Sequence, residues 1–176
     1  MPVAPEPNFP ANLIVECSDC HLRAGCNKPV PGKGPIPARI LLLGQNPGRD
    51  EDKWGKPFIG KAGRHLDSLL FQSGVTRDDV YITNVVKCLT SGNKKPNNIS
   101  TTACSKWLEL ELELVDPEII VAMGASAIYA ILGNTAGTVE HLHGKPVIVR
   151  VGSKDRIVLP CYHPAAALWN WSGPTI

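Results

Sequence analysis

The sequence predicts an α/β fold, in which a mostly parallel central sheet is flanked by helices on both faces to make three layers (α/β/α). Two observations predict this class. Short apolar runs that are typical of buried strands alternate along the chain with segments whose apolar residues recur at helical spacing. The chain has 176 residues, a length that suits one hydrophobic core, so we treat residues 1–176 as a single domain.

The first elements follow a proline-rich start. Residues 1–12 are expected to be extended because prolines crowd them. Residues 39–43 form a continuous apolar run that ends at a glycine, which is typical of a strand buried on both faces. Residues 61–73 are expected to form a helix, because three leucines recur there at helical spacing and Gly74 follows where a helix commonly ends. A second strand is expected at residues 80–83.

The second half of the chain repeats this alternation. A helix is expected at residues 100–115, with Ser100 or Thr101 as its N-cap and a proline shortly after its end. Strands separated by helices predict a parallel sheet with right-handed crossovers. The remaining expected elements are a strand at 118–123, a short helix at 125–132 that a glycine closes, and strands at 147–151 and 156–161.

The composition argues against a secreted or membrane-bound protein. The N-terminus has neither the basic nor the apolar segment of a signal peptide, and no apolar run is long enough to span a membrane. Six cysteines in such a chain predict metal ligands or buried thiols in place of disulfides. We therefore expect a cytoplasmic protein with no membrane partner.

Positive charge is concentrated locally. The formal net charge is only +2, which is too small to indicate a nucleic-acid binder by itself. Two short stretches concentrate cations, and each is either a DNA contact or an ordinary solvated loop. The first contains Lys53, Lys56, Lys61 and Arg64, and the second contains Lys87, Lys94 and Lys95.

Polar segments follow three of the expected strands. Residues 44–48, with the sequence Gly-Gln-Asn-Pro-Gly, follow the first strand, Asn84 follows the second, and His163 and Pro164 follow the last. In a parallel sheet the ligand crevice lies beyond the carboxyl ends of the strands. Each segment alone has an ordinary explanation, namely a turn, a loop cap or a structural histidine. Together they predict a functional site at one edge of the sheet.

Four cysteines are candidate ligands of one metal centre. Two residues separate Cys17 from Cys20, whereas Cys88 follows the second strand and Cys104 lies near the start of the next helix. The fold would have to bring the two pairs together. Four thiolates suit a structural zinc ion and a [4Fe–4S] cluster alike, so the spacing leaves both open.

These motifs resemble those of the iron–sulfur uracil-DNA glycosylases, family four of the uracil-DNA glycosylase superfamily. The resemblance spans nearly the whole chain, and the order and spacing of the motifs are specific. It implies one [4Fe–4S] cluster on the same four cysteines, whereas Cys26 and Cys161 do not match the family's ligand positions. The matching segments are residues 17–20, 44–48, 55–63, 81–88 and 162–166.

The resemblance also implies the substrate and the residues that bind it. Enzymes of this kind act on uracil-containing DNA and flip the base into a pocket. Phe58 is expected to stack on the base, and Asn84 is expected to recognise uracil O4 and N3–H, which excludes cytosine. The backbone around Gly44 and Gln45 is expected to line the pocket. His163 is expected to donate a hydrogen bond to O2, where negative charge grows as the bond breaks.

One motif position departs from the family's pattern. The family commonly has Ala or Gly after a Glu, whereas this chain has Asn46 after Gln45. Other branches place Asp or Asn there to orient the attacking water, so Asn46 is the expected catalytic residue, although an amide cannot take a proton. The acidic residues 50–52 are either alternative water-activating groups or a solvated turn. Asn46 also leaves open a broader range of mismatched or deaminated bases.

The segment after His163 is expected to bind DNA. In the superfamily it enters the minor groove, so Pro164 and Leu168 are expected contacts, with Leu168 or Trp169 filling the gap that the flipped base leaves. The alternative is that Leu168, Trp169 and Trp171 pack as core.

The predicted function is therefore that of a monomeric DNA repair hydrolase, which releases uracil and leaves an abasic site. Two interpretations compete with it. One is a uracil-binding iron–sulfur module that lacks a competent water, and the other is an iron–sulfur redox protein. A phenylalanine in the core and a histidine that caps a strand are the ordinary alternatives for Phe58 and His163.

Overall fold

The structure is a computed structural model and describes residues 11–133 and 136–168. Within this part of the chain five strands form one sheet, in the order β2-β1-β3-β5-β4. Four strands run parallel, and β4 pairs with β5 in the antiparallel direction. This confirms the mostly parallel sheet. The strands are β1 (Ile40–Gly44), β2 (Val80–Asn84), β3 (Ile119–Met123), β4 (Val147–Val151) and β5 (Lys154–Cys161).

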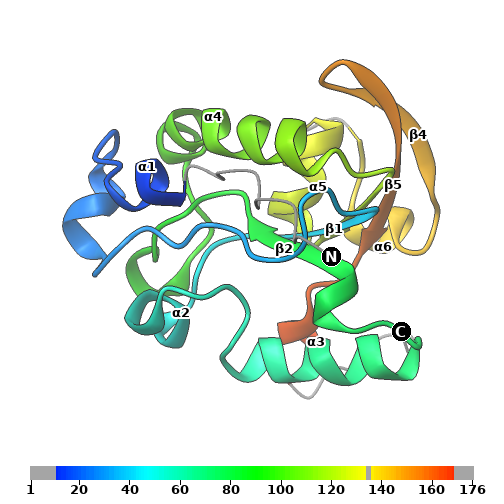
Figure 1. Cartoon of the computed structure of the whole chain (residues 1–176), viewed down its shortest axis with the longest axis horizontal. Helices are drawn as coiled ribbons and strands as arrows, with labels where there is room; N and C mark the ends of the chain where they lie inside the picture. The colour runs from blue at the N-terminus through cyan, green and yellow to red at the C-terminus, as the bar shows by residue number, and fades with distance from the viewer. Residues whose placement is uncertain (1–10, 134–135, 169–176) are drawn as a thin grey trace, which may run out of the picture.

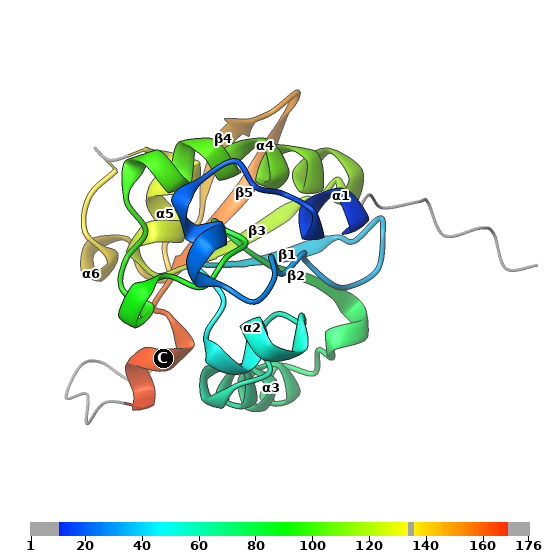
Figure 2. The same ribbon diagram turned by 90° about the vertical axis from the view of Figure 1, so that its left-hand side faces the viewer.

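Helices cover both faces of the sheet, so the three-layer prediction is confirmed (Figures 1 and 2). On one face lie α4 (Asn98–Val115) and α5 (Ala125–Leu132); on the other lies α3 (Lys61–Gln72), in contact with η4 (Pro164–Leu168). The shorter helices among the described residues are α1 (Ala11–Val15), η1 (His21–Gly25), α2 (Arg49–Trp54), η2 (Arg77–Asp79), η3 (Ser91–Asn93) and α6 (Val139–Leu142).

Alternate residues of β1 belong to different cores. Leu41 and Leu43 are buried with Leu112 of α4 on one face. Leu42 is buried with Leu66 of α3 on the other face. Successive side chains of a strand point to opposite faces, so a strand covered on both sides must be apolar throughout. This explains the unbroken apolar run in the sequence.

The strand order creates a switch point beside β1. The chain leaves β1 for β2 on one side and then returns past β1 to β3 on the other side. Open α/β sheets bind ligands in the crevice at such a point, beyond the carboxyl ends of the strands. Figure 2 looks toward this edge of the sheet, where α2 and η4 lie.

The start of α4 differs from the sequence expectation. The helix begins at Asn98, because the side chain of Asn97 accepts a hydrogen bond from the Ser100 N–H at 2.9 Å. Asn97 is therefore the N-cap, and neither Ser100 nor Thr101 has that role.

Other differences concern short or paired segments. Residues 11–12 belong to α1, so the expected extended conformation is wrong there, and residues 1–10 lie outside the described residues. β5 begins two residues earlier than expected, at Lys154, because its first residues pair with β4. The helix α2 was not expected, since six mostly charged residues carry no helical pattern of apolar residues.

Candidate active site

The candidate site begins at Gly44, the last residue of β1. Gly44 pairs in register with Asn84, the last residue of β2. A Cβ at position 44 would lie 2.4 Å from Phe58 Cζ and 2.5 Å from Asn84 Oδ1. Two side chains therefore approach the glycine so closely that no other residue fits without displacing them. The fold thus brings Gly44, Phe58 and Asn84 to one place at the carboxyl edge of the sheet.

Asn84 presents an unused hydrogen-bond acceptor at this site. The residue is only 1% exposed, and its Oδ1 atom has no hydrogen-bond partner within the described part of the chain. An unpaired buried acceptor costs about 1–3 kcal/mol, and such atoms are rare in proteins. An N–H group of a ligand would satisfy it. Lys87 Nζ donates a hydrogen bond to the backbone carbonyl of Asn84 at 2.7 Å.

His163 lies beside Phe58, in the loop that follows β5. The centroids of the two rings are 5.7 Å apart, and their planes are tilted by 32°. The Ala165 N–H donates a hydrogen bond to His163 Nδ1 at 3.1 Å. Nδ1 is therefore an acceptor, which leaves the proton of the neutral ring on Nε2. Burial lowers the pKa of His163 to about 4, so the neutral ring prevails near pH 7.

The loop that carries Phe58 is held in an uncommon backbone conformation. Phe58 has a φ of 51°, in the left-handed region where non-glycine residues are strained. The carboxylate of Glu51 in α2 accepts hydrogen bonds from the N–H groups of Ile59 (2.8 Å) and Gly60 (2.7 Å). The guanidinium of Arg77 donates to the Phe58 carbonyl. These contacts hold the Phe58 ring over the end of β1.

Asn46 lies in a chain of hydrogen-bonded side chains. The Ser126 hydroxyl donates to Gln45 Oε1 at 2.7 Å, and Gln45 Nε2 donates to Asn46 Oδ1 at 2.8 Å. Asn46 Nδ2 donates to Asn93 Oδ1 at 2.7 Å and to the Pro47 carbonyl at 2.9 Å. Each bond fixes the orientation of the next amide, which leaves Asn46 Oδ1 with one free acceptor position. Sequence reasoning missed Ser126 and Asn93, because contacts between distant segments leave no local pattern.

Two of the three acidic residues at 50–52 are structural. Glu51 is buried and, besides the bonds already described, accepts from the Gly48 N–H at 3.0 Å. Asp52 is buried and accepts from the backbone and side-chain N–H groups of Asn27, at 2.9 and 2.5 Å. Asp50 alone is exposed. Glu51 and Asp52 are therefore neither part of a solvated turn nor free general bases, and Asp50 is the residue of the three to which these alternatives still apply.

Lys87 does not belong to a basic surface patch. It is buried, and its Nζ atom lies 2.6 Å from Glu111 Oε2 and 2.7 Å from Thr83 Oγ1. A buried ammonium requires such partners, because it has lost its water. The second cationic stretch thus presents only Lys94 and Lys95 to solvent.

The start of η4 is buried and its end is exposed. Pro164 is buried and lies in the turn in which the Ala166 N–H donates to the His163 carbonyl at 2.8 Å, and its contact with DNA stays a prediction. Leu168 is 46% exposed, so it is not a core residue. Trp169 and Trp171 lie outside the described residues.

The cysteines gather at the N-terminal segment and the loop after β2. The Trp107 indole N–H donates to Cys17 Sγ at 3.2 Å, and the Lys87 backbone N–H donates to Cys104 Sγ at 3.3 Å. Burial raises the pKa of Cys104 to about 11. All six cysteines are free thiols. Four of them line one small cavity: Cys17, Cys20, Cys88 and Cys104.

Two further observations describe this cysteine cavity. Burial is the main cause that raises the pKa of Cys88, and a hydrogen bond with Cys26 is the next, so Cys26 lies beside the cavity although it matches no ligand position of the family. In the part of the chain that the structure describes, no three His, Cys, Asp or Glu side chains are arranged around a single metal ion.

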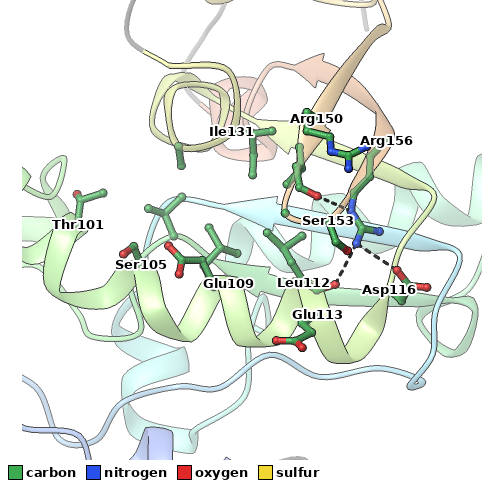
Figure 3. A pocket seen from close by; sticks show the side chains of 15 residues that line it. Thr101, Ser105, Glu109, Leu112, Glu113, Asp116, Ile131, Arg150, Ser153 and Arg156 are labelled. Carbon is green, nitrogen blue, oxygen red and sulfur yellow. Dashed lines mark hydrogen bonds and ion pairs between the residues drawn. The ribbon is translucent and has the colours of Figure 1, made fainter.

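A cavity of about 710 Å³ lies away from these residues, between α4, α5 and the β4–β5 hairpin (Figure 3). Arg156 is held in its wall by Asp116 at 3.1 Å and by the Leu112 carbonyl at 3.4 Å. Glu109 and Glu113 border it on α4. None of its lining residues belongs to the pocket at the carboxyl edge, so cavity size does not mark the site here.

Comparison with known proteins places this geometry in a family. The sequence profile of the Uracil DNA glycosylase superfamily matches residues 31–175. This chain belongs to that superfamily. None of the helices that the structure describes in this superfamily member is long and apolar enough to cross a membrane.

Several characterised members of the superfamily are similar to this one. The type-4 uracil-DNA glycosylase of Sulfurisphaera tokodaii is 38% identical over 161 residues, which cover 89% of this chain and 73% of that protein. The type-4 enzyme of Thermotoga maritima is 37% identical over 159 residues, which cover 90% of this chain and 81% of that protein. The type-5 uracil-DNA glycosylase of Thermus thermophilus is 38% identical over 122 residues, covering 61% and 55%.

Proposed function

We propose that this superfamily member is a DNA repair enzyme that hydrolyses the N-glycosidic bond of uracil in DNA. One observation carries the proposal, namely two complementary groups in one pocket. Asn84 Oδ1 is a buried acceptor with no partner among the described residues, and His163 is a neutral ring whose free nitrogen is a donor. Uracil offers N3–H and O2 side by side on one edge, which match these two groups.

The same pocket explains discrimination between bases. Uracil extruded from the helix would stack on Phe58, with N3–H bonded to Asn84 Oδ1 and O4 bonded to its amide N–H. Cytosine has no proton on N3 and carries an amino group in place of O4, so it would leave both Asn84 groups unpaired. Such unpaired groups are what make a polar site selective. The absence of a side chain at Gly44 lets the Phe58 ring and the Asn84 amide lie close to each other, as this contact pattern requires.

The chemical step separates charge, and the two catalytic residues act on different parts of it. The bond between uracil N1 and the sugar C1′ breaks with its electron pair on the base, and His163 Nε2–H stabilises the charge at O2. A water whose oxygen bonds to C1′ is oriented by the free acceptor position of Asn46 Oδ1. Because an amide does not take the proton of this water, the proton passes to solvent.

The four cysteines that line one cavity fit an iron–sulfur cluster. We propose a [4Fe–4S] cluster on Cys17, Cys20, Cys88 and Cys104, with two N–H groups already directed at the sulfur atoms. Four thiolates would also suit a structural zinc ion, and the resemblance to the iron–sulfur uracil-DNA glycosylases favours the cluster. The cluster has a structural role here, because it ties the N-terminal segment to the loop that follows Asn84.

Iron and sulfide analysis of anaerobically purified protein tests the cofactor. We expect about four irons and four sulfides per chain, following from a cubane cluster. Cys88→Ser should lose the cluster, whereas Cys161→Ser, outside the cavity, should keep it. Stoichiometric zinc in place of iron would contradict the proposal.

The substrate is uracil-containing DNA, and one chain suffices for it. Every residue of the proposed pocket comes from a single chain, so we propose a monomer, which sedimentation at enzyme concentrations used in assays will check. Leu168, exposed on η4 beside the His163 loop, is the proposed wedge for the gap that the extruded base leaves. Six free thiols favour a reducing cytoplasm.

An assay with defined oligonucleotides tests the proposed function. The protein is incubated with DNA that contains one uracil, and alkali then cuts the strand wherever a base has been lost. We expect scission at uracil and none at cytosine in matched DNA. Asn84→Asp replaces the amide donor by an acceptor, so the ratio of the rates on uracil and cytosine should fall by at least about a hundredfold. Binding of uracil-containing DNA without scission would show a binding module instead.

A further inference from the structure

The outer surface of α2 carries an exposed aromatic residue. Trp54 is the last residue of α2 and is 62% exposed. Lys53 Nζ lies 5.1 Å from the centroid of the Trp54 ring, a cation–π contact that holds the indole. Gly55, which follows, ends the helix with a φ of 68°. The Trp54 ring is therefore presented to solvent at a fixed point of the backbone, directly before the loop of Phe58.

The electrostatic character of this surface is more positive than its sequence indicates. Glu51 and Asp52 are buried and bonded to backbone groups, so their carboxylates face inward. Asp50 remains as the exposed carboxylate of α2. The described residues place no carboxylate within ion-pair distance of the nearby cations, which are Arg49, Lys53, Lys56, Lys61 and Arg64, all exposed.

This surface adjoins the proposed uracil pocket. α2 follows Gly48, which ends the motif after β1, and Gly55 leads from α2 into the loop that carries Phe58. α2 and η4 lie on the same side of the molecule, at the edge of the sheet that Figure 2 faces. A strand whose base occupies the proposed site would therefore run along the side of the molecule that carries α2.

We propose that Trp54 stacks on an unpaired base of single-stranded DNA next to the uracil, while Lys53 and Lys56 bind its phosphates. Aromatic side chains among cations bind single strands in this way, because every base has a flat face whatever its sequence. In a duplex the neighbouring bases are stacked inside the helix, so Trp54 has no base to contact. The inference rests on the proposed function for the position of the uracil, and it adds Trp54 as a contact with the strand outside the proposed uracil site.

The stacking of a base on Trp54, which we call the platform, is tested independently of catalysis by binding to an oligonucleotide without uracil. Fluorescence anisotropy of a labelled single strand gives the Kd of the full chain and of each variant. Trp54→Ala should raise the Kd about tenfold, and Trp54→Phe should restore most of the affinity. Phe71→Ala is the matched control, because Phe71 is an 83% exposed aromatic residue near the far end of α3. An unchanged Kd for Trp54→Ala, or an equal loss for Phe71→Ala, would overturn the proposal.

The salt dependence of the same Kd tests the two lysines. Each phosphate contact on a single strand contributes about 0.7 to the slope of log K against log salt concentration. Lys53→Gln and Lys56→Gln should each reduce the slope by about that amount. An unchanged slope in both variants would remove them from the interface.

Excision assays separate this inference from the proposed function. Trp54→Ala should raise the KM for uracil in a single strand about tenfold, with the KM for duplex uracil and both kcat values unchanged. Equal effects on the two substrates would overturn the platform and leave the glycosylase intact. Trp54-dependent binding without any excision would instead keep the platform and overturn the proposed function.

Discussion

At the level of single residues, Gly44 allows Phe58 and Asn84 to take the positions proposed for binding a base. The backbone of Gly44 is that of an ordinary strand, so Gly44→Ala should still fold, but its methyl group would displace the Phe58 ring and the Asn84 amide. We expect uracil excision to fall by at least about a hundredfold, as loss of a key contact commonly causes. Gly25→Ala is the control, because a Cβ there meets nothing within 4 Å. A Gly44→Ala variant of normal activity would show that the base binds elsewhere.

His163 should make stability depend on pH. Its pKa is about 4 in the folded protein, compared with 6.5 for an ordinary histidine. The unfolded chain therefore takes up a proton before the folded protein does. The contribution of His163 to the free energy of unfolding is fully present above pH 6.5. It is lost as the pH falls toward 4, at up to about 1.4 kcal/mol per pH unit.

Urea unfolding of the wild type and of His163→Gln at several pH values measures this contribution. The difference between their free energies of unfolding should shrink as the pH is lowered from 6.5 to 4.5. A constant difference would mean that His163 is not buried as a neutral ring.

Asn93 should act through Asn46. Asn93→Ala removes the acceptor that orients the Asn46 amide, so we expect kcat to fall about tenfold with KM unchanged, because orientation matters in the chemical step. Asn93→Asp keeps an acceptor and should retain most of the activity. In the Asn46→Ala background, Asn93→Ala should cause no further loss. Additive losses would show that the two residues act independently.

Some residues of the candidate site could be identified from the sequence, and others could not. Gly44 and Asn84 were found because strand ends of a parallel sheet collect at one edge. The burial of Lys87 and Glu51 was not foreseen, because a charged residue in a sequence looks the same whether it faces water or a buried partner. Their partners, Glu111 and the backbone near Ile59, are set only by the tertiary fold.

At the level of single elements, α2 holds the loop that carries Phe58 in place. Glu51→Ala would leave the N–H groups of Gly48, Ile59 and Gly60 without their acceptor. We expect the free energy of unfolding to fall by at least about 2 kcal/mol and the KM for uracil DNA to rise. Asp50→Ala, the exposed neighbour, should change stability by less than about 0.5 kcal/mol. Equal effects of the two substitutions would show that Glu51 does not hold the Phe58 loop in place.

Elements with a strong apolar pattern were predictable, and short polar ones were not. The helix at 125–132 and the strand at 147–151 lie where the sequence predicts them, because apolar spacing and a closing glycine define them. The first turn of α4 was missed because its N-cap, Asn97, lies before the apolar residues whose spacing indicates the helix. α2 was missed because its acidic residues are held by tertiary contacts and not by a helical pattern.

At the level of the whole molecule, the cysteine cavity and the proposed catalytic residue His163 lie in different parts of the fold. The cysteine cavity lies at the N-terminal segment and the loop after Asn84, whereas His163 arrives from the far strand β5. Lys87 joins the two regions, since its ammonium binds the Asn84 carbonyl and its N–H donates to Cys104. The proposed metal centre would thus support Asn84, the proposed uracil-binding residue, whereas His163 is proposed to act on the leaving base.

A neutral His163 is proposed to stabilise the departing uracil, and single-turnover excision measures this effect. Wild type and His163→Ala are each mixed in excess with an oligonucleotide that contains one uracil, and the abasic product is followed by alkaline scission. We expect His163→Ala to lose at least about a hundredfold in rate while its affinity for the DNA changes little. Excision by His163→Ala at a near-normal rate would show that His163 does not stabilise the leaving base.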